Sequence, residues 1–502
     1  MRKFAVASIA AALLLNPAAA FADTGASQPA AYAAFSLTAD TSAQKADIRA
    51  FEEIKKLFDA AQVDIAKVKQ QYVSAFQAKV QALIPDTDAL IVAVLDGAAA
   101  GHYSVQQAKQ AVDKGLQGYF YAQITKLTKE TAKTALTEGK KDMARTAVEQ
   151  AVELYAGALR GTVIKRDNTY GTRMQEQLDT IIVPKMLEAV NSGDVLGYNV
   201  IRQMFDKTLI KTFHLATITY AKKVPDLAKT NLADAKVGMT EGYFFFLPIY
   251  NSMSGGHKPS ADAIKAAFES GDPAKLSEAA VKNAFFHALT GKIAGYADKV
   301  LNADWTVKDN REKAQEQAME GNMFLSAMEV LLTEKLGKDV FARMSLDAQA
   351  YYEAVKAGDK AKATASVINV LKALSGQIGV TFQIGEAKLN ANGKVVTIDA
   401  PSFVAKGRTL VPARALVEAL GGSIKAEKAG AKTKIVIEKD GSTIEFLVGG
   451  TAIVKDGKTL EYTFDQPALI KNGRTFIPLR AVSQALGQHV FYDASSRTVI
   501  VL

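Results

Sequence analysis

The sequence contains no cysteine among its 502 residues, and this absence excludes several classes of protein. A chain without cysteine has no disulfide bond, no thiol nucleophile and no acylated residue of the kind that anchors a lipoprotein. Large exported proteins that lack disulfides are more typical of the exterior of Gram-positive bacteria than of eukaryotic secretion. If the chain is exported, we therefore expect a Gram-positive source.

Long apolar runs are also missing from the sequence. No stretch reaches the 18 or more uncharged apolar residues that a transmembrane helix requires. The N-terminus instead follows the pattern of a signal peptide, with two basic residues, an apolar run over residues 4–15 and an Ala-x-Ala cleavage site that ends at Ala22. We expect removal of residues 1–22 and a flexible N-terminal segment over residues 23–43. The mature chain is then exported and has no transmembrane segment.

Motifs of the common catalytic sites are absent as well. The sequence has no G-x-S-x-G elbow, no H-E-x-x-H pair, no Walker A loop and no G-x-G-x-x-G turn. It has five histidines, no two of them within twenty residues of each other: His102, His214, His257, His287 and His489. We interpret His287, which lies in an apolar helical pattern, as a packed residue, because the other repeats carry different residues there. We expect no catalytic residue and no cofactor.

Acidic residues are fewer than basic ones, and the difference is unevenly distributed. The chain has 61 Lys plus Arg and 52 Asp plus Glu, and the mature chain without Arg2 and Lys3 has a net charge of +7. Residues 380–502 hold five of these positive charges, with 16 basic and 11 acidic residues. An exported basic region suits anionic cell-wall polymers, and a solvated lysine-rich surface is the alternative. We expect such polymers or another surface protein as partners, and no nucleic acid.

Residues 44–379 have the composition and spacing of helices, and the pattern repeats. Apolar residues recur at intervals of three and four, and a Gly-Asp pair returns at Gly193-Asp194, Gly271-Asp272 and Gly358-Asp359. Glycine in the left-handed conformation ends one helix, and the aspartate caps the next one. The sequence therefore predicts an all-α helical-hairpin repeat domain over this range.

Three repeats carry a glutamate at matching positions, Glu153, Glu241 and Glu320, in helical stretches rich in Ala, Met, Phe and Tyr. Carboxylates that face the interior of a helical bundle can form metal sites, but the Glu-x-x-His pairs typical of di-iron proteins are absent. A buried carboxylate needs a partner, and nearby Lys and Tyr side chains offer one. We favour a structural role for these glutamates, with metal ligation as the alternative.

The hydrophobic period changes near Val380 from helical to alternating, and the last part of the chain is duplicated. GRTLVPARALVEALG at Gly407–Gly421 returns as GRTFIPLRAVSQALG at Gly473–Gly487. Asn392-Gly393 and Asp456-Gly457 are typical of tight hairpin turns. The sequence of each copy predicts a β-hairpin, followed by the GRT turn, a helix and a return strand. We expect a multidomain protein in which residues 380–502 form a small duplicated α+β domain that folds independently.

These repeated phrases resemble the copper amine oxidase N-terminal-like domain, also called the stalk domain, over about 120 residues. The resemblance implies a non-catalytic appendage that is common in exported proteins of spore-forming Gram-positive bacteria. It implies no amine oxidase chemistry here, because that chemistry needs three copper-binding histidines and an N-Y-[DE] tyrosine. The nearest sequence, Asn168-Thr169-Tyr170, does not fit this motif.

The turns that begin the two GRT phrases allow two interpretations. Lys406-Gly407-Arg408 and its counterpart Asn472-Gly473-Arg474 resemble phosphate-binding turns. We favour the simpler interpretation, in which a turn enters a strand and the arginine packs on the sheet.

Two hypotheses for the whole chain follow. The first is an exported, non-enzymatic cell-surface protein whose helical ectodomain is attached at the envelope through the stalk-type domain. The alternative is an extracytoplasmic protein that binds a metal, haem or small ligand within the helical domain. The hypotheses differ in whether the matched glutamates converge on one pocket.

Overall fold

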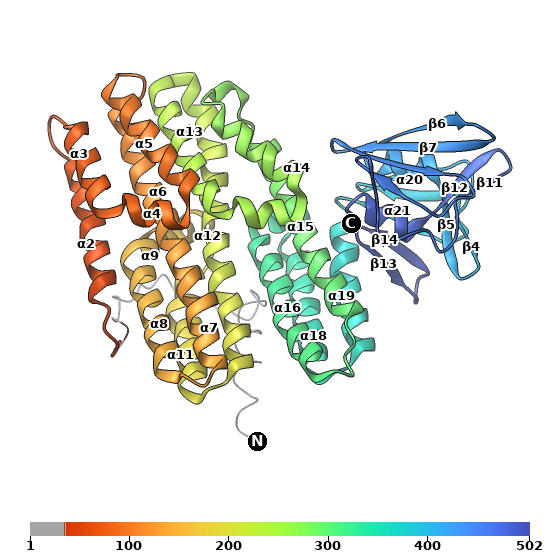
Figure 1. Ribbon diagram of the computed structural model, residues 1–502, viewed down its shortest axis with the longest axis horizontal. Coiled ribbons are helices and arrows are strands. Elements are labelled where there is room, and N and C mark those ends of the chain that lie inside the picture. The colour runs from red at the N-terminus through yellow and green to blue at the C-terminus, as the bar shows by residue number, and fades with distance from the viewer. Residues whose placement is uncertain (1–34, 36) are drawn as a thin grey trace. The chain divides into compact units, whose positions relative to one another are not determined.

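The computed structural model describes residues 35 and 37–502 (Figure 1), and the chain divides into two compact units. One unit comprises Met1–Leu289 and Met319–Ser345, and the other comprises Thr290–Ala318 and Leu346–Leu502. The predicted signal peptide and most of the predicted flexible segment lie outside the described residues. Among the helices that are described, none is long and apolar enough to cross a membrane.

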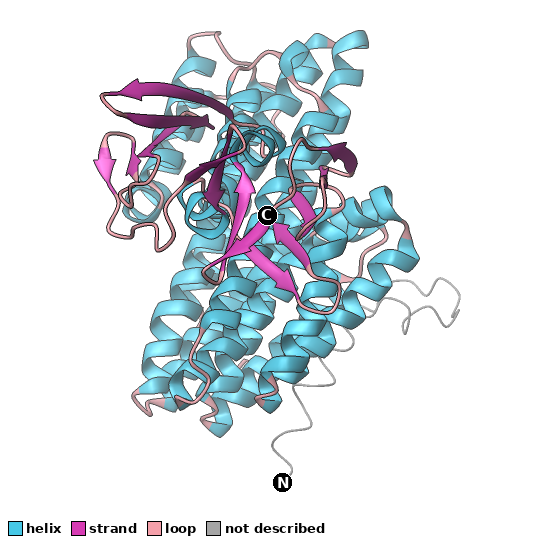
Figure 2. Cartoon of the chain, turned by 90° about the vertical axis from the view of Figure 1, so that its right-hand side faces the viewer, coloured by secondary structure: helices cyan, strands magenta, loops and turns pink. Residues whose placement is uncertain are grey.

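Helices alone make up the chain from Ser42 to Ser375, as the sequence predicts (Figure 2). Several pairs of consecutive helices are each joined by a π-helical turn. The helices are α2 Ser42–Leu57, α3 Ile65–Tyr72, α4 Ala78–Leu83, α5 Pro85–Ala99, α6 Val105–Thr125, α7 Lys133–Thr137, α8 Lys141–Leu154, α9 Arg160–Tyr170, α10 Met174–Gln177, α11 Val183–Ser192, α12 Val195–Thr230, α13 Leu232–Phe246, α14 Tyr250–Glu269, α15 Glu278–Asn302, α16 Lys308–Ala327, α17 Glu329–Leu336, α18 Lys338–Ala357 and α19 Lys360–Ser375.

The predicted Gly-Asp turns are confirmed. The three glycines have positive φ angles of 78° at Gly193, 62° at Gly271 and 78° at Gly358. Asp194 and Asp359 each accept a hydrogen bond of 2.9 Å from the backbone N–H three residues later. Glycine adopts this left-handed conformation without a steric penalty, and the aspartate satisfies an N–H that the helix leaves unpaired. The Gly-Asp pairs thus fix where one helix ends and the next begins.

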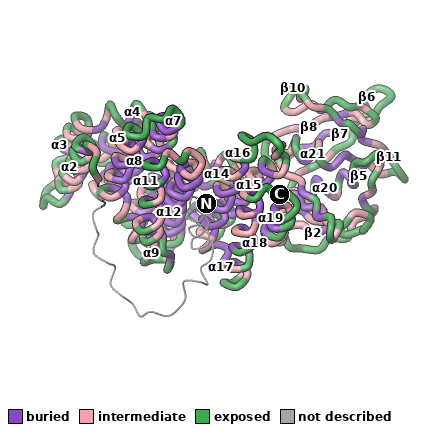
Figure 3. The backbone as a smooth tube through the Cα atoms, turned by 90° about the horizontal axis from the view of Figure 1, so that it is seen from below, coloured by how far each residue is buried: buried purple, intermediate pink, exposed green. Residues whose placement is uncertain are grey.

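Helix α12 forms the centre of the first unit. It has 36 residues, and its buried residues lie on every side of the helix, as its largely purple tube in Figure 3 shows. It packs against α7, α9, α11 and α13. The buried residues of α12 include charged side chains such as Lys207 and Lys211, which form ion pairs with buried or partly buried carboxylates. The core of this unit surrounds α12.

Strands begin at Val380 and form three antiparallel sheets in the second unit. Their orders are β13-β14-β1-β2-β3, β10-β9-β8-β7-β6 and β11-β12-β5-β4. The strands are β1 Val380–Gln383, β2 Lys388–Ala391, β3 Lys394–Thr397, β4 Phe403–Ala405, β5 Arg408–Pro412, β6 Ser423–Ala429, β7 Lys432–Lys439, β8 Ser442–Leu447, β9 Val454–Lys455, β10 Lys458–Thr459, β11 Leu469–Lys471, β12 Arg474–Pro478, β13 Val490–Asp493 and β14 Thr498–Val501. Each copy also contributes one short helix, α20 Ala413–Ala419 or α21 Leu479–Ala485.

The two copies of the duplicated region interlock. The return strand of the first copy, β7, pairs with the opening strand of the second copy, β8. The return strand of the second copy, β14, pairs in the same way with the opening strand of the first copy, β1. Each five-stranded sheet therefore contains strands of both copies. The predicted hairpin, helix and return strand of each copy are present, but each copy has seven strands, more than the sequence predicts, and the exchange of strands is visible only in the structure.

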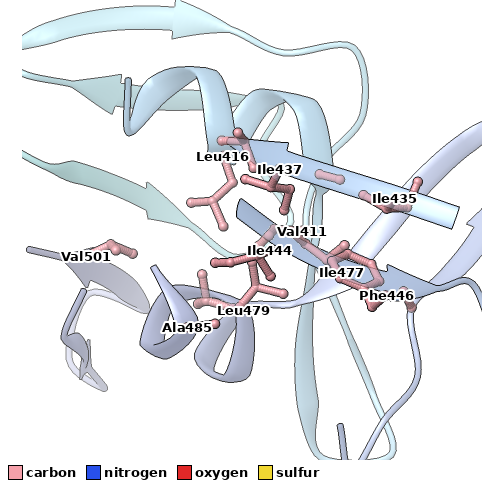
Figure 4. Close-up of a cluster of buried hydrophobic side chains, with 14 of the residues drawn as sticks. Val411, Leu416, Ile435, Ile437, Ile444, Phe446, Ile477, Leu479, Ala485 and Val501 are labelled. Atoms are coloured by element: carbon pink, nitrogen blue, oxygen red, sulfur yellow. The ribbon is translucent and has the colours of Figure 1, made fainter. Parts of the chain in front are cut away.

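The central sheet joins the copies through β5 and β12, which pair with Leu410 opposite Pro478 and Val411 opposite Ile477. Figure 4 shows part of the apolar cluster at this junction, to which both copies contribute. Val411 and Ile477 are buried in it, with 3% and 0% of their surface exposed. The duplicated region thus shares one core between the copies.

Helix α19 packs against β13 and β14 within the second unit. The Lys372 ammonium forms an ion pair with the Asp493 carboxylate, and it donates a hydrogen bond of 3.2 Å to the Ser496 hydroxyl. The last helix of the predicted helical domain is therefore joined to the strands that follow. Independent folding on either side of residue 380 stays a prediction.

Candidate binding site

The matched glutamates of the helical unit contact lysines, and Glu320 shows the arrangement most clearly. Its carboxylate lies 2.9 Å from the Lys207 ammonium, which also lies 2.5 Å from Asp206. The Lys207 side chain is 8% exposed and lies over the Phe324 ring, 5.3 Å from its centroid. Burial alone would lower the pKa of Lys207, but the two carboxylates raise that pKa above its usual value. Lys207 therefore stays charged within the helical core.

Glu241 has the same surroundings in another repeat. The Lys114 ammonium lies 3.5 Å from Glu241 and 2.7 Å from Asp113, and 5.2 Å from the centroid of the Phe245 ring. Burial raises the pKa of Asp113, but the neighbouring Lys114 lowers it below its usual value. In both repeats an Asp-Lys pair on one helix meets a Glu on another helix, and a Phe follows that Glu by four residues. The Asp, Lys and Glu thus form a buried triad in each of the two repeats. The repetition shows a shared packing solution.

Glu153 lies 3.8 Å from the Lys45 ammonium, and Glu153 and its neighbour Glu149 also contact the residues before α2. The Glu149 carboxylate is fully buried and accepts hydrogen bonds from the backbone N–H groups of Thr38, at 2.5 Å, and Ala39, at 2.6 Å. Glu153 accepts a hydrogen bond of 3.2 Å from the Thr41 hydroxyl. These contacts hold the last residues of the predicted flexible segment against α8.

The three candidate metal ligands therefore have different partners. Across residues 37–502 the structure contains no group of three or more His, Asp or Glu side chains arranged to hold a metal ion. A lysine ammonium within 2.9 Å of Glu320 would also repel a cation at the same carboxylate. Metal ligation by Glu153, Glu241 and Glu320 thus gains no support from the geometry, and their structural role stays a prediction.

The histidines occupy different environments. His214 of α12 is fully buried with its ring 4.4 Å from that of Phe285, and burial lowers its pKa to about 3. The rings of His257 and His287 approach within 5.6 Å, although thirty residues separate them in the chain. Sequence spacing gave no sign of this pair. His287 is half-buried beside another imidazole, so the sequence described its helix correctly but missed its neighbour.

The duplicated region contains a groove with a volume of about 550 Å³. Its walls come from both copies: β4 and β5 of the first, and α21, β13, β14 and the segment before β11 of the second. The side chains that give it chemical character are two arginines, one aspartate, two tyrosines and three smaller polar groups, namely Arg408, Arg480, Asp465, Tyr462, Tyr492, Thr409, Thr463 and Gln484. A concave surface with a few convergent polar groups is the usual form of a ligand site.

The two arginines of the groove differ in their partners. Arg408 forms an ion pair with Asp465, and both side chains are more than half exposed. Arg480 is exposed and makes no ion pair with any residue that the structure describes. The second arginine therefore leaves one uncompensated positive charge at the groove. Partial burial also raises the pKa of Tyr462, so its hydroxyl is neutral at physiological pH.

The GRT phrases begin with turns that enter strands, as predicted, but their arginines form ion pairs and are exposed to a large extent rather than packed on the sheet. Lys406 and Gly407 have φ angles of 48° and 73°, and Asn472 and Gly473 have 51° and 73°, as a two-residue hairpin turn requires. The arginine that follows each turn pairs across the copies, Arg408 with Asp465 and Arg474 with Asp399. Sequence reasoning missed the groove, because its walls belong to segments that only strand pairing brings together.

Comparison with known proteins identifies one region of the chain. No curated protein and no solved structure matches the sequence. The predicted resemblance is confirmed, and the match begins before Val380, within α19. The model of the Copper amine oxidase N-terminal domain family matches residues 363–430 and 390–501, while the helical region before them matches no family.

Proposed function

We propose that the chain is an exported, non-enzymatic protein of the Gram-positive cell envelope. In this proposal the basic C-terminal region attaches the protein to anionic wall polymers, and the helical region is displayed from it. The match to a domain found in bacterial extracellular proteins carries the proposal. The excess of 16 basic over 11 acidic residues in 380–502 supports the choice of ligand charge.

The alternative, a metal or haem site within the helices, has less support. The candidate carboxylates of that region are already paired with protein groups: Glu320 and Glu241 lie beside lysines, and Glu149 accepts hydrogen bonds from backbone N–H groups. Buried polar groups that satisfy one another stabilise a core and leave no free ligand set. We therefore assign the helical region to display and contact with another surface protein.

Binding of the mature full-length chain to isolated Gram-positive cell walls tests the proposal. We expect binding at low ionic strength and release as salt rises, because exposed charges are screened over about 10 Å at 0.1 M salt. Replacing three exposed lysines of the C-terminal region, Lys428, Lys432 and Lys458, with glutamine should weaken binding.

The matched control replaces three exposed lysines of the helical region, Lys67, Lys129 and Lys222, with glutamine. The change in net charge is the same, so any difference between the two variants reports where attachment occurs. Equal loss in both variants would contradict attachment through the C-terminal region. If the unaltered protein binds no wall preparation, the proposed envelope function is wrong.

A further inference from the structure

The groove of the duplicated region differs between the two copies in a way that packing does not require. Two of its polar residues have counterparts sixty-six positions earlier in the first copy: Gln484 corresponds to Glu418, and Tyr492 to Ala426, while Tyr462 lies in a stretch where the second copy is two residues longer. Both copies nevertheless form the same strands and helix. Tyrosine at position 492 is therefore not needed for the fold.

A cavity beside the corresponding helix of the first copy is much smaller than the groove. Pro412 and Ala415 of the first copy correspond to Pro478 and Ala481, which line the groove. The cavity beside Pro412 and Ala415 measures only about 10 Å³, against about 550 Å³ for the groove. Duplication has thus produced two similar halves, of which the second has an open wall with aromatic and amide side chains.

The chemistry of the groove indicates what it would hold. Tyr492 is 44% exposed, and Tyr462 beside it is half-buried, so both rings combine an apolar face with a polar hydroxyl. Sugar rings present the complementary surface, with apolar C–H faces and hydroxyl edges. The exposed guanidinium of Arg480 presents several N–H donors suited to a phosphate or carboxylate.

We infer that this groove binds a segment of an anionic glycan, with the sugar rings against Tyr462 and Tyr492 and an acidic group at Arg480. The inference rests on the proposed envelope function and gives it a defined site. Specific recognition at the groove can be distinguished from general charge attraction, because only one of two equivalent arginines would contact the glycan. Arg414 is the counterpart of Arg480; it is exposed, lies outside the groove lining, and forms no ion pair with the residues that the structure describes.

This pair of arginines provides the central experiment. The mature full-length protein is titrated calorimetrically with poly(glycerol phosphate) bearing sugar substituents and with a polyuronic acid. We expect Arg480→Gln to weaken binding by about tenfold, the loss of one charge-assisted contact, and Arg414→Gln to leave binding unchanged. Equal effects of the two substitutions would overturn the groove while leaving general charge attraction, and therefore the proposed function, in place.

A second variant replaces two groove residues with those of the first copy: Gln484→Glu and Tyr492→Ala. It should fold, because the first copy carries these residues at equivalent positions, and unchanged circular dichroism and thermal midpoint would confirm this. We expect it to lose at least tenfold in affinity for both glycans. Unchanged affinity in the folded variant would contradict the assignment.

Two further polymers test the ligand class. Inorganic polyphosphate has the charge without the sugar, and neutral dextran has the sugar without the charge. We expect both to bind more weakly than the anionic glycans. If polyphosphate binds as strongly as the anionic glycans, the sugar contributes nothing to binding. If dextran binds as strongly, the charge contributes nothing. Either result would overturn the inference. The phosphate and uronate polymers distinguish which acidic group Arg480 prefers.

Discussion

Val411 of β5 lies opposite Ile477 of β12, its own counterpart in the second copy of the duplicated region. The pairing of two equivalent residues means that a local two-fold relationship between the copies passes through the central sheet. Both side chains are buried, so each copy contributes to the core of the other. The duplicated region is therefore one cooperative structure rather than two adjoining small ones.

Shortening a buried side chain at this junction should destabilise the whole duplicated region. We expect Ile477→Ala to lower the free energy of unfolding by about 2–5 kcal/mol, because it leaves a cavity in a closed core. The matched control is Val404→Ala on β4 of the same sheet, where the side chain is 56% exposed and the change should stay within about 0.5 kcal/mol. Denaturant unfolding of the full chain gives both values. A loss confined to the second copy, as seen by hydrogen exchange, would contradict the shared core.

The contact between α19 and the strands should depend on pH. Asp493 accepts hydrogen bonds from Lys372 and two serines, and these contacts hold its pKa well below the usual 3.8. A carboxylate with a depressed folded pKa contributes stability that is fully present above the unfolded pKa. That stability is lost as pH falls through the folded pKa.

We therefore expect Asp493→Asn to lower the free energy of unfolding at pH 7 by about 1–3 kcal/mol, the range for hydrogen bonds to charged groups. The difference from the unaltered protein should shrink as pH falls below about 4, where the unfolded carboxylate becomes protonated. Urea unfolding at pH 7, 4 and 3 measures it. A difference that is independent of pH would show that the Asp493 charge is not what stabilises the contact.

The buried lysine triads should be costly to break. Lys207→Met leaves Asp206 and Glu320 without their cation, and loss of one partner from a buried ion pair costs about 3–5 kcal/mol. Lys114→Met should behave alike, because its triad has the same composition. Thermal unfolding compares these variants with Lys229→Met, a lysine whose side chain is 73% exposed. Similar small effects in all three would contradict the structural role of the triads.

Replacement of Glu153, Glu241 and Glu320 together by glutamine separates the structural and metal-binding interpretations. We expect the variant to keep its fold, because glutamine preserves the size and most hydrogen bonds, although it loses the charge opposite Lys207. Elemental analysis of the purified unaltered protein should find no stoichiometric iron, zinc or manganese. Metal that is present in the unaltered protein and absent from the variant would establish the binding-protein alternative.

The sequence by itself determined which part of the chain is helical, which part contains strands, and where several of these elements end. The Gly-Asp pairs predicted helix boundaries because glycine relieves the left-handed backbone and aspartate caps the next helix, both of which are local effects. The change of hydrophobic period predicted the first strand at Val380, and the Asn-Gly and Asp-Gly pairs predicted hairpin turns. The repeated GRT phrase predicted a duplication and its family, because short-range spacing alone defines the motif.

Only the tertiary structure decided which of these elements pair with one another. The exchange that pairs β14 with β1 depends on contacts between residues more than a hundred positions apart, such as Val380 with Val501, and no local pattern encodes such contacts. The sequence could not identify which lysines contact Glu241 and Glu320 for the same reason, because each lysine and its glutamate lie on helices that are distant in sequence. The groove also depends on this closure: Arg408 and Tyr492 line one surface because long-range pairing closes the sheets around a shared core.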